Sequence, residues 1–121
     1  MGDVHAVMAD GEVVICGLEI PARITVKVTV LKDVDYPLPL LADKESIMTI
    51  ASAETLDKAA SAATKKMQMF LVEQLKMEIV EAGMLLSLVG DLKICQIVNT
   101  LKTARIELPV WVIEEYGVKL D

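Results

Sequence analysis

Two consecutive helical patterns in the middle of the chain restrict its fold more than any other feature. From residue 56 to residue 76, apolar side chains recur at three- and four-residue intervals, and most polar side chains fall on the opposite face. Residues 78–89 continue with a second apolar face, and Gly90 is expected to end that helix in the left-handed conformation. Helices of this kind bury their apolar faces against another layer, so the fold depends on the strands that flank them.

Strand patterns lie on both sides of the helical region. Residues 47–51 predict a short buried strand, and Ser52 is the expected N-cap of the first helix, with Thr55 as the alternative. Residues 92–98 predict a second strand, and a turn at residues 99–100 leads to a third. The third strand has an outer face of Thr103, Arg105 and Glu107 and an inner face of Ala104, Ile106 and Leu108.

The first third of the chain predicts hairpins. Four apolar residues alternate with polar ones over residues 24–30, which predicts a half-exposed antiparallel strand. Residues 33–46 contain two prolines and predict an irregular linker of a length often used to cover an opening. We therefore expect one α+β domain over residues 1–121, with β-hairpins and a mixed or antiparallel sheet carrying two consecutive helices on one face. Its parts are a hairpin-rich part (1–32), the linker (33–46) and a strand-helix-helix-strand-strand part (47–121).

The dipeptide Asp10-Gly11 separates two extended, apolar runs near the start of the chain. Asp-Gly between such runs is a strong short-range hairpin signal, because both residues tolerate the positive φ angles of a two-residue loop. In such a hairpin, His5 faces Cys16 and Val7 faces Val14 across the ladder.

The first arm of this hairpin carries a candidate metal-binding pair. Asp3 and His5 lie on one strand face with Cα atoms about 6.5–7 Å apart, and imidazole and carboxylate ligands together suit a divalent metal ion. Glu12 lies on the same face, but a regular ribbon places it too far away to share that ion, unless a bulge or a looser loop intervenes. In the alternative interpretation His5 is a half-buried strand residue, Asp3 and Asp10 form turns, and Glu12 begins a solvated strand.

Composition excludes several classes of function. The net charge of −6 and the pI near 4.7 argue against binding to nucleic acid or to an anionic membrane, since both require a basic surface. Cys16 and Cys95 fit no disulfide or metal-binding spacing, so we expect free thiols, although Cys16 opposite His5 would also allow a thiol–imidazole pair. No signal-peptide pattern begins the chain, and we expect a cytoplasmic protein. The tryptophan, Trp111, is expected to be a packing anchor.

The motif around the hairpin resembles a known enzyme family. Residues 2–5 read Gly-Asp-Val-His and residues 8–12 read Met-Ala-Asp-Gly-Glu, which resembles the Gly-Asp-x-His and Gly-Asp-Gly-Glu motifs of the acetamidase/formamidase family of amide hydrolases. The family usually has glycine where this chain has Ala9. The similarity continues in order through residues 47–56, 84–92 and 96–99. The chain thus resembles the C-terminal portion of such an enzyme, less than half of the usual polypeptide.

This resemblance implies hydrolysis of the C–N bond of a small linear amide, such as formamide or acetamide, to ammonia and a carboxylate. It implies a metal-assisted reaction, in which His5 and Asp3 hold a divalent ion, zinc or else calcium, and Glu12 is the general base or proton shuttle. The expected partners are the small amide substrate and either a second copy of this chain or a complementary N-terminal chain. The alternative function is a non-catalytic module for oligomerisation or partner binding, because the chain is 54% hydrophobic with a mean hydropathy of +0.49.

Overall fold

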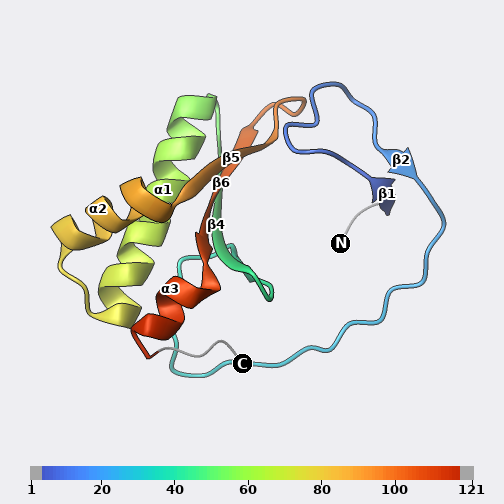
Figure 1. Ribbon diagram of the computed structural model, residues 1–121. Coiled ribbons are helices and arrows are strands. Elements are labelled where there is room, and N and C mark those ends of the chain that lie inside the picture. Colours follow the sequence, from blue (N-terminus) through green and yellow to red (C-terminus); the bar gives the residue numbers. More distant parts are fainter. Residues whose placement is uncertain (1–3, 118–121) are drawn as a thin grey trace.

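The computed structural model describes residues 4–117 (Figure 1). A four-stranded antiparallel sheet in the order β3-β4-β6-β5 is built from β3 (Leu40–Ala42), β4 (Ser46–Ala53), β5 (Asp91–Gln96) and β6 (Lys102–Pro109). On one face of this sheet lie α1 (Leu56–Leu75) and α2 (Ile79–Val89), and α3 (Val110–Glu115) follows β6. A separate two-stranded sheet pairs β1 (His5–Val7) with β2 (Leu18–Glu19). The predicted α+β fold, with two consecutive helices on one face of the sheet, is confirmed.

The central strands of the large sheet pair over their whole length. In β4 and β6, eight residue pairs run from Ser46 opposite Pro109 to Ala53 opposite Lys102. Burial alternates along both strands, so that Ala104, Ile106 and Leu108 face the helices as their spacing predicts. The opposite side chains of β6 lie on the face that carries no helix.

Polar groups at both ends of α1 fix its length. Thr55, the alternative in the sequence, is the N-cap: its hydroxyl accepts a hydrogen bond from the backbone N–H of Lys58 at 3.3 Å. Ser52 instead lies within β4, where its hydroxyl is 2.8 Å from that of Thr103 on β6. At the other end Lys76 adopts a left-handed conformation with φ of 58° and ends the helix.

The end of α2 differs from the prediction at Gly90. Its φ is −77° and its conformation is extended, so the expected left-handed cap is wrong. Glycine is nevertheless required by space, because a Cβ atom here would lie 2.5 Å from the carbonyl oxygen of Leu86. The chain therefore turns directly from α2 into β5 with its backbone in close contact with the last helical turn.

The core lies between the sheet and α1, with contributions from α2 and α3. Its largest fully buried side chains include Phe70 and Met67 from α1 and Ile47 from β4. The fully buried Thr49 hydroxyl donates a hydrogen bond of 2.8 Å to the carbonyl oxygen of Ala63, which ties the sheet to α1.

Two expectations about packing at the chain's edges need correction. Residues 33–46 are not wholly irregular, since β3 pairs with β4 inside this segment. Trp111 is 59% exposed and does not anchor the core, because the first turn of α3 places Val112 and Ile113 inward instead.

None of the described helices combines the length and the apolar character needed to cross a membrane.

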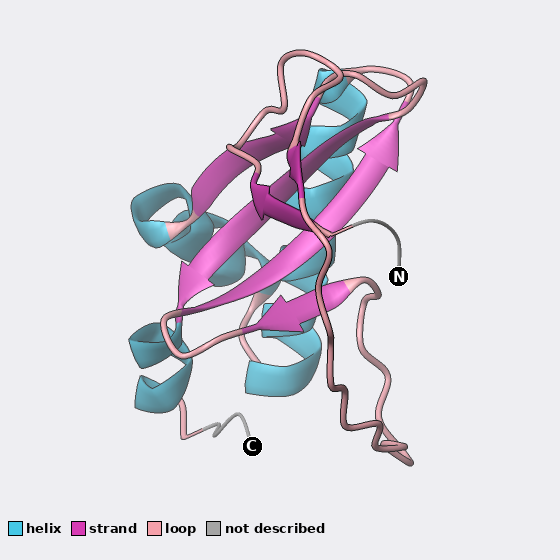
Figure 2. Cartoon of the chain, turned by 90° about the vertical axis from the view of Figure 1, so that its right-hand side faces the viewer, coloured by secondary structure: helices cyan, strands magenta, loops and turns pink. Residues whose placement is uncertain are grey.

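The N-terminal part lies on the side of the large sheet that carries no helix. There β1 and β2 lie in front of the sheet, and the chain then follows a long extended path around it (Figure 2). The strand predicted over residues 24–30 is wrong: this stretch pairs with no strand of the described chain, and its side chains are exposed. The alternating pattern of residues 24–30 indicates an amphipathic segment, but a β-strand forms only where a neighbouring strand is available to pair with it.

The predicted hairpin register is also wrong. His5 pairs with Glu19 rather than Cys16, and Val7 pairs with Leu18 rather than Val14. A turn does form at Asp10-Gly11, closed by a 3.2 Å hydrogen bond from the N–H of residue 12 to the carbonyl of residue 9. The backbone of Gly11 forms hydrogen bonds with Cys95 on β5 and with Ile97, the residue after β5. The turn therefore lies against the large sheet, and the loop between β1 and β2 is longer than in the predicted hairpin.

Candidate functional site

The lengthened loop between β1 and β2 creates a pocket that the regular hairpin would not contain. This pocket, about 350 Å³ in volume, is lined by His5, Glu12, Ile15, Cys16, Gly17 and Glu19. The backbone of Glu12 has a positive φ of 30°, next to Gly11 at 91°, which marks the sharp change of direction in the loop. The looser loop thus brings Glu12 into the same pocket as His5, although a flat ribbon would keep them apart.

Close packing fixes the imidazole of His5. Its side chain is 27% exposed, and Gly17 lies directly against the ring. A Cβ atom at Gly17 would lie 2.5 Å from Cδ2 and 3.0 Å from Nε2 of His5, so only glycine leaves room for the ring in this position. On the other side, a carboxylate oxygen of Glu19 lies 3.9 Å from Nε2.

These donors fit part of a metal site. Two ligands on one tetrahedral zinc ion lie about 3.4 Å apart, from metal–ligand distances of about 2.0–2.2 Å, so the His5–Glu19 separation needs only a small adjustment. Glu19 is thus a candidate donor that sequence reasoning had not assigned a role. Asp3, the predicted partner of His5, lies outside the described residues. Within residues 4–117, no three His, Cys, Asp or Glu side chains gather in an arrangement suited to a metal ion.

A bidentate ion pair attaches the turn before Glu12 to the large sheet. Arg105 on β6 donates from Nη1 and Nη2 to the two carboxylate oxygens of Asp10, at 2.7 and 3.0 Å. These hydrogen bonds lower the pKa of Asp10, and they are the main cause of the raised pKa of Arg105. Gly11 adds two backbone hydrogen bonds, donating to Cys95 at 3.2 Å and accepting from Ile97 at 3.1 Å. We call these contacts the turn anchor.

Further charges on the same sheet face hold Arg105 in place. Its Nε donates to one carboxylate oxygen of Glu107 at 2.7 Å, and Lys93 on β5 donates to the other at 2.7 Å. Lys93 also lies 3.4 Å from Asp91, and the hydrogen bond to Glu107 is the main cause of its raised pKa. The sequence placed Arg105 and Glu107 on the outer face of the strand. It gave no sign that Arg105 pairs with Asp10, which lies 95 residues earlier in the chain.

Cysteine chemistry receives limited support from this arrangement. Cys16 is exposed and lines the pocket, but it is not the strand partner of His5. The Cys95 thiol lies 3.6 Å from Nη1 of Arg105, on the sheet side of the turn anchor. Both cysteines are free thiols, as the sequence predicted.

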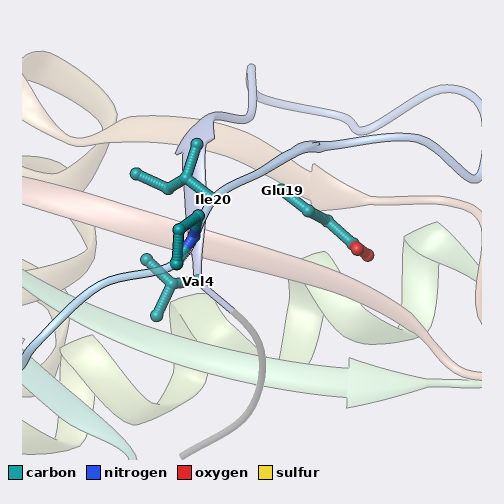
Figure 3. Close-up of a pocket in the computed structure, with 4 residues that line it drawn as sticks. Val4, Glu19 and Ile20 are labelled. Atoms are coloured by element: carbon teal, nitrogen blue, oxygen red, sulfur yellow. The ribbon is translucent and has the colours of Figure 1, made fainter.

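A second pocket of about 420 Å³ lies beside β2 and is lined by Val4, Glu19, Ile20 and Pro21. The side chains of Val4 and Ile20 lie near each other, whereas Glu19 points away from them (Figure 3). Since this pocket offers a single ionisable side chain, it lacks the paired polar groups of the His5 pocket. The two pockets share Glu19, which places them around the same strand.

Comparison with solved structures identifies the class of fold. The chain superposes on an acetamidase from Bacillus halodurans with a TM-score of 0.90 and 54% sequence identity, covering 94% of this chain and 39% of that one. A predicted acetamidase/formamidase from the thermophile Thermoanaerobacter tengcongensis gives a TM-score of 0.90 at 37% identity, over 96% and 38% of the two chains. An acetamidase from Yersinia enterocolitica gives 0.85 at 29% identity, over 90% and 33%.

Identity and structure together define the family. No protein-family model matches the sequence, and no curated protein matches it significantly. The three structural matches nevertheless confirm the resemblance read from the sequence: the chain is similar over nearly its whole length to part of acetamidase/formamidase structures. It spans less than two-fifths of the length of these structures, which is consistent with the C-terminal portion of such a protein.

Proposed function

We propose that this chain provides part of the active site of an amidase that hydrolyses small linear amides such as formamide or acetamide. In this reaction water adds to the carbonyl carbon, the C–N bond breaks, and ammonia and a carboxylate are released. The single observation that carries the proposal is the 54% identity to an acetamidase at a TM-score of 0.90. The pocket that contains both His5 and Glu12 supports it, because their residue types suit this chemistry.

The polar residues of the pocket other than Cys16 have proposed roles, as do Gly17 and Asp3. Glu12 accepts a proton from the attacking water and returns it to the leaving nitrogen. His5 and Asp3 hold a divalent metal ion, zinc or else calcium, and Glu19 is a further donor beside His5. A bound ion would supply Lewis-acid chemistry here, by polarising the amide carbonyl or by lowering the pKa of water. Gly17 keeps the imidazole in position, and the turn anchor holds the turn that precedes Glu12.

A chimera provides the test, because this chain spans only part of its structural relatives. In it, this chain replaces the matched 39% of the Bacillus halodurans acetamidase. We expect the chimera to bind a stoichiometric metal ion and to release ammonia from formamide. His5→Ala should abolish metal binding, measured by elemental mass spectrometry, while the circular-dichroism spectrum stays unchanged. A His5→Ala chimera that keeps its metal but loses stability would show that the histidine is structural.

A second candidate function is a non-catalytic module for self-association. The apolar character of α2 favours it: Val80, Met84 and Leu88 are 69%, 56% and 81% exposed along one side of the helix. Together with Gly83 and Ser87 they line a shallow, mostly apolar groove of about 450 Å³. Sedimentation equilibrium of the chain and of Leu88→Asp tests self-association through this face, and ammonia release by the chimera separates the two functions.

A further inference from the structure

The segment from residue 20 to residue 34 follows an extended path and, after its first residue, pairs with no strand of the described chain. Ile20 donates a backbone hydrogen bond to Val4, but none of the described strands pairs with residues 21–34. The path curves away from the sheet and the helices, and it is seen from two directions in Figure 1 and Figure 2. We call residues 20–34 the extended segment.

Apolar side chains of the extended segment are exposed in an order typical of a paired strand. Ile24, Val26, Val28 and Val30 are 52%, 57%, 85% and 77% exposed, and they alternate with polar residues. Such a segment has one apolar face and two edges of unpaired backbone N–H and C=O groups. A second strand that pairs with an edge would satisfy the backbone hydrogen-bonding groups, and a layer that covers the apolar face would bury its side chains.

The longer structural matches offer a candidate for the occupant of this surface. The superposition on the Bacillus halodurans acetamidase leaves out 6% of 121 residues, about seven, so it includes at least half of the 15-residue extended segment. The TM-score of 0.90 shows that the two chains are similar over the aligned residues taken together. The acetamidase chain is more than twice as long as this one, and the polypeptide that this chain does not span is available to hold the path in place.

We propose that the extended segment is a docking surface for β-strands of the part of an acetamidase polypeptide that this chain does not span. Pairing along the edges of residues 21–34 would satisfy the backbone, and Val28 and Val30 would be buried under the added layer. The occupant is thus a strand-forming segment of complementary sequence rather than a second copy of this chain. This proposal concerns assembly and does not depend on the proposed catalytic roles.

Co-production with the unmatched part of the Bacillus halodurans acetamidase tests the proposal. Tagged full chain should capture that part, and amide hydrogen exchange in residues 21–34 should slow at least tenfold in the complex relative to the chain alone. Val28→Asp should reduce the captured amount at least tenfold. Ile79→Asp is the matched control, because Ile79 is also a β-branched, exposed residue (53%) and lies outside both the extended segment and the α2 groove, and it should capture as much as the parent.

The outcomes separate the occupants. Failure of the parent chain to capture the other part, equal capture by Val28→Asp, or equal losses in both variants would overturn the proposal. The proposal would also be overturned if amide exchange in residues 21–34 were already slow in the chain alone because the chain self-associates, and if Val28→Asp abolished that self-association. The occupant would then be a second copy of this chain. Exchange in β4 and β6 reports whether each variant remains folded. A Glu12→Gln chain should capture normally, so a failure of catalysis cannot be mistaken for a failure of docking.

Discussion

Removal of Arg105 should release the turn that precedes Glu12 without unfolding the sheet. Arg105→Met keeps the long aliphatic side chain on β6 but removes both hydrogen bonds to Asp10. The side chain of Arg105 is 17% exposed and that of Asp10 is 56% exposed, so the pair is only partly shielded from water. The two backbone hydrogen bonds of Gly11 remain, but they then hold the turn alone.

The size of the effect follows from this partial exposure. Exposed ion pairs contribute about 0.2–1 kcal/mol, whereas hydrogen bonds to charged groups contribute about 1.5–3 kcal/mol. A bidentate pair with one partly buried and one exposed partner lies between these ranges, and we expect about 1–2 kcal/mol. At room temperature this corresponds to a roughly 5- to 30-fold larger population of the detached turn.

Amide hydrogen exchange at two reporter positions measures this population directly. The N–H groups of Gly11 and Ile97 bond between the turn and the sheet, so both should exchange about 5- to 30-fold faster in Arg105→Met. Lys93→Met is the control, because Lys93 bonds to Glu107 on the same sheet face but not to the turn. Unchanged exchange at both reporters, or equal acceleration in Lys93→Met, would refute the anchoring role of Arg105.

Three further outcomes are expected. The hydrogen bond from Arg105 lowers the pKa of Asp10 in the folded protein below its usual value of 3.8. The turn anchor therefore contributes its full stability above pH 3.8, and this contribution is lost as the pH falls through the pKa of Asp10 in the folded protein. An NMR titration of the Asp10 carboxyl group would follow this loss. Gly17→Ala should displace the histidine ring, seen as shifted imidazole resonances, whereas Gly83→Ala on α2 should leave them unchanged. Thr49→Val should lower the free energy of unfolding in urea by about 0.5–1.5 kcal/mol, because it removes a buried hydrogen bond that joins β4 to α1. Thr64→Val should have less effect, because its hydroxyl is only partly buried and bonds within α1.

Local sequence patterns predicted the sheet and the two helices well, because these elements show the simple hydrophobic periodicity of strands and helices. The outward positions of Arg105 and Glu107 followed from alternation along one strand, and the burial of Ile106 followed from the same alternation. The choice between Ser52 and Thr55 as the helix cap depended on where β4 ends. That boundary is set by its pairing with β6, which no local pattern contains.

The candidate site was harder to predict because distant contacts shape it. Asp10-Gly11 was correctly identified as a turn, but its attachment to β5 and β6 changes which residues of the two arms face each other. The pairing of Asp10 with Arg105 joins residues 95 positions apart and leaves no local signal. The amphipathic pattern of residues 24–30 was real, but the strand prediction failed because no described neighbour completes the ladder.

The proposed amidase function requires that this chain carry catalytic residues. The most direct measurement compares initial rates of ammonia release from formamide by the Bacillus halodurans chimera and by its Glu12→Gln variant, with Glu114→Gln on α3 as the matched control. Removal of a general base should lower the rate about 100-fold or more while the metal content stays unchanged, and Glu114→Gln should retain the parent rate. Equal rates for Glu12→Gln and the parent chimera would contradict the account.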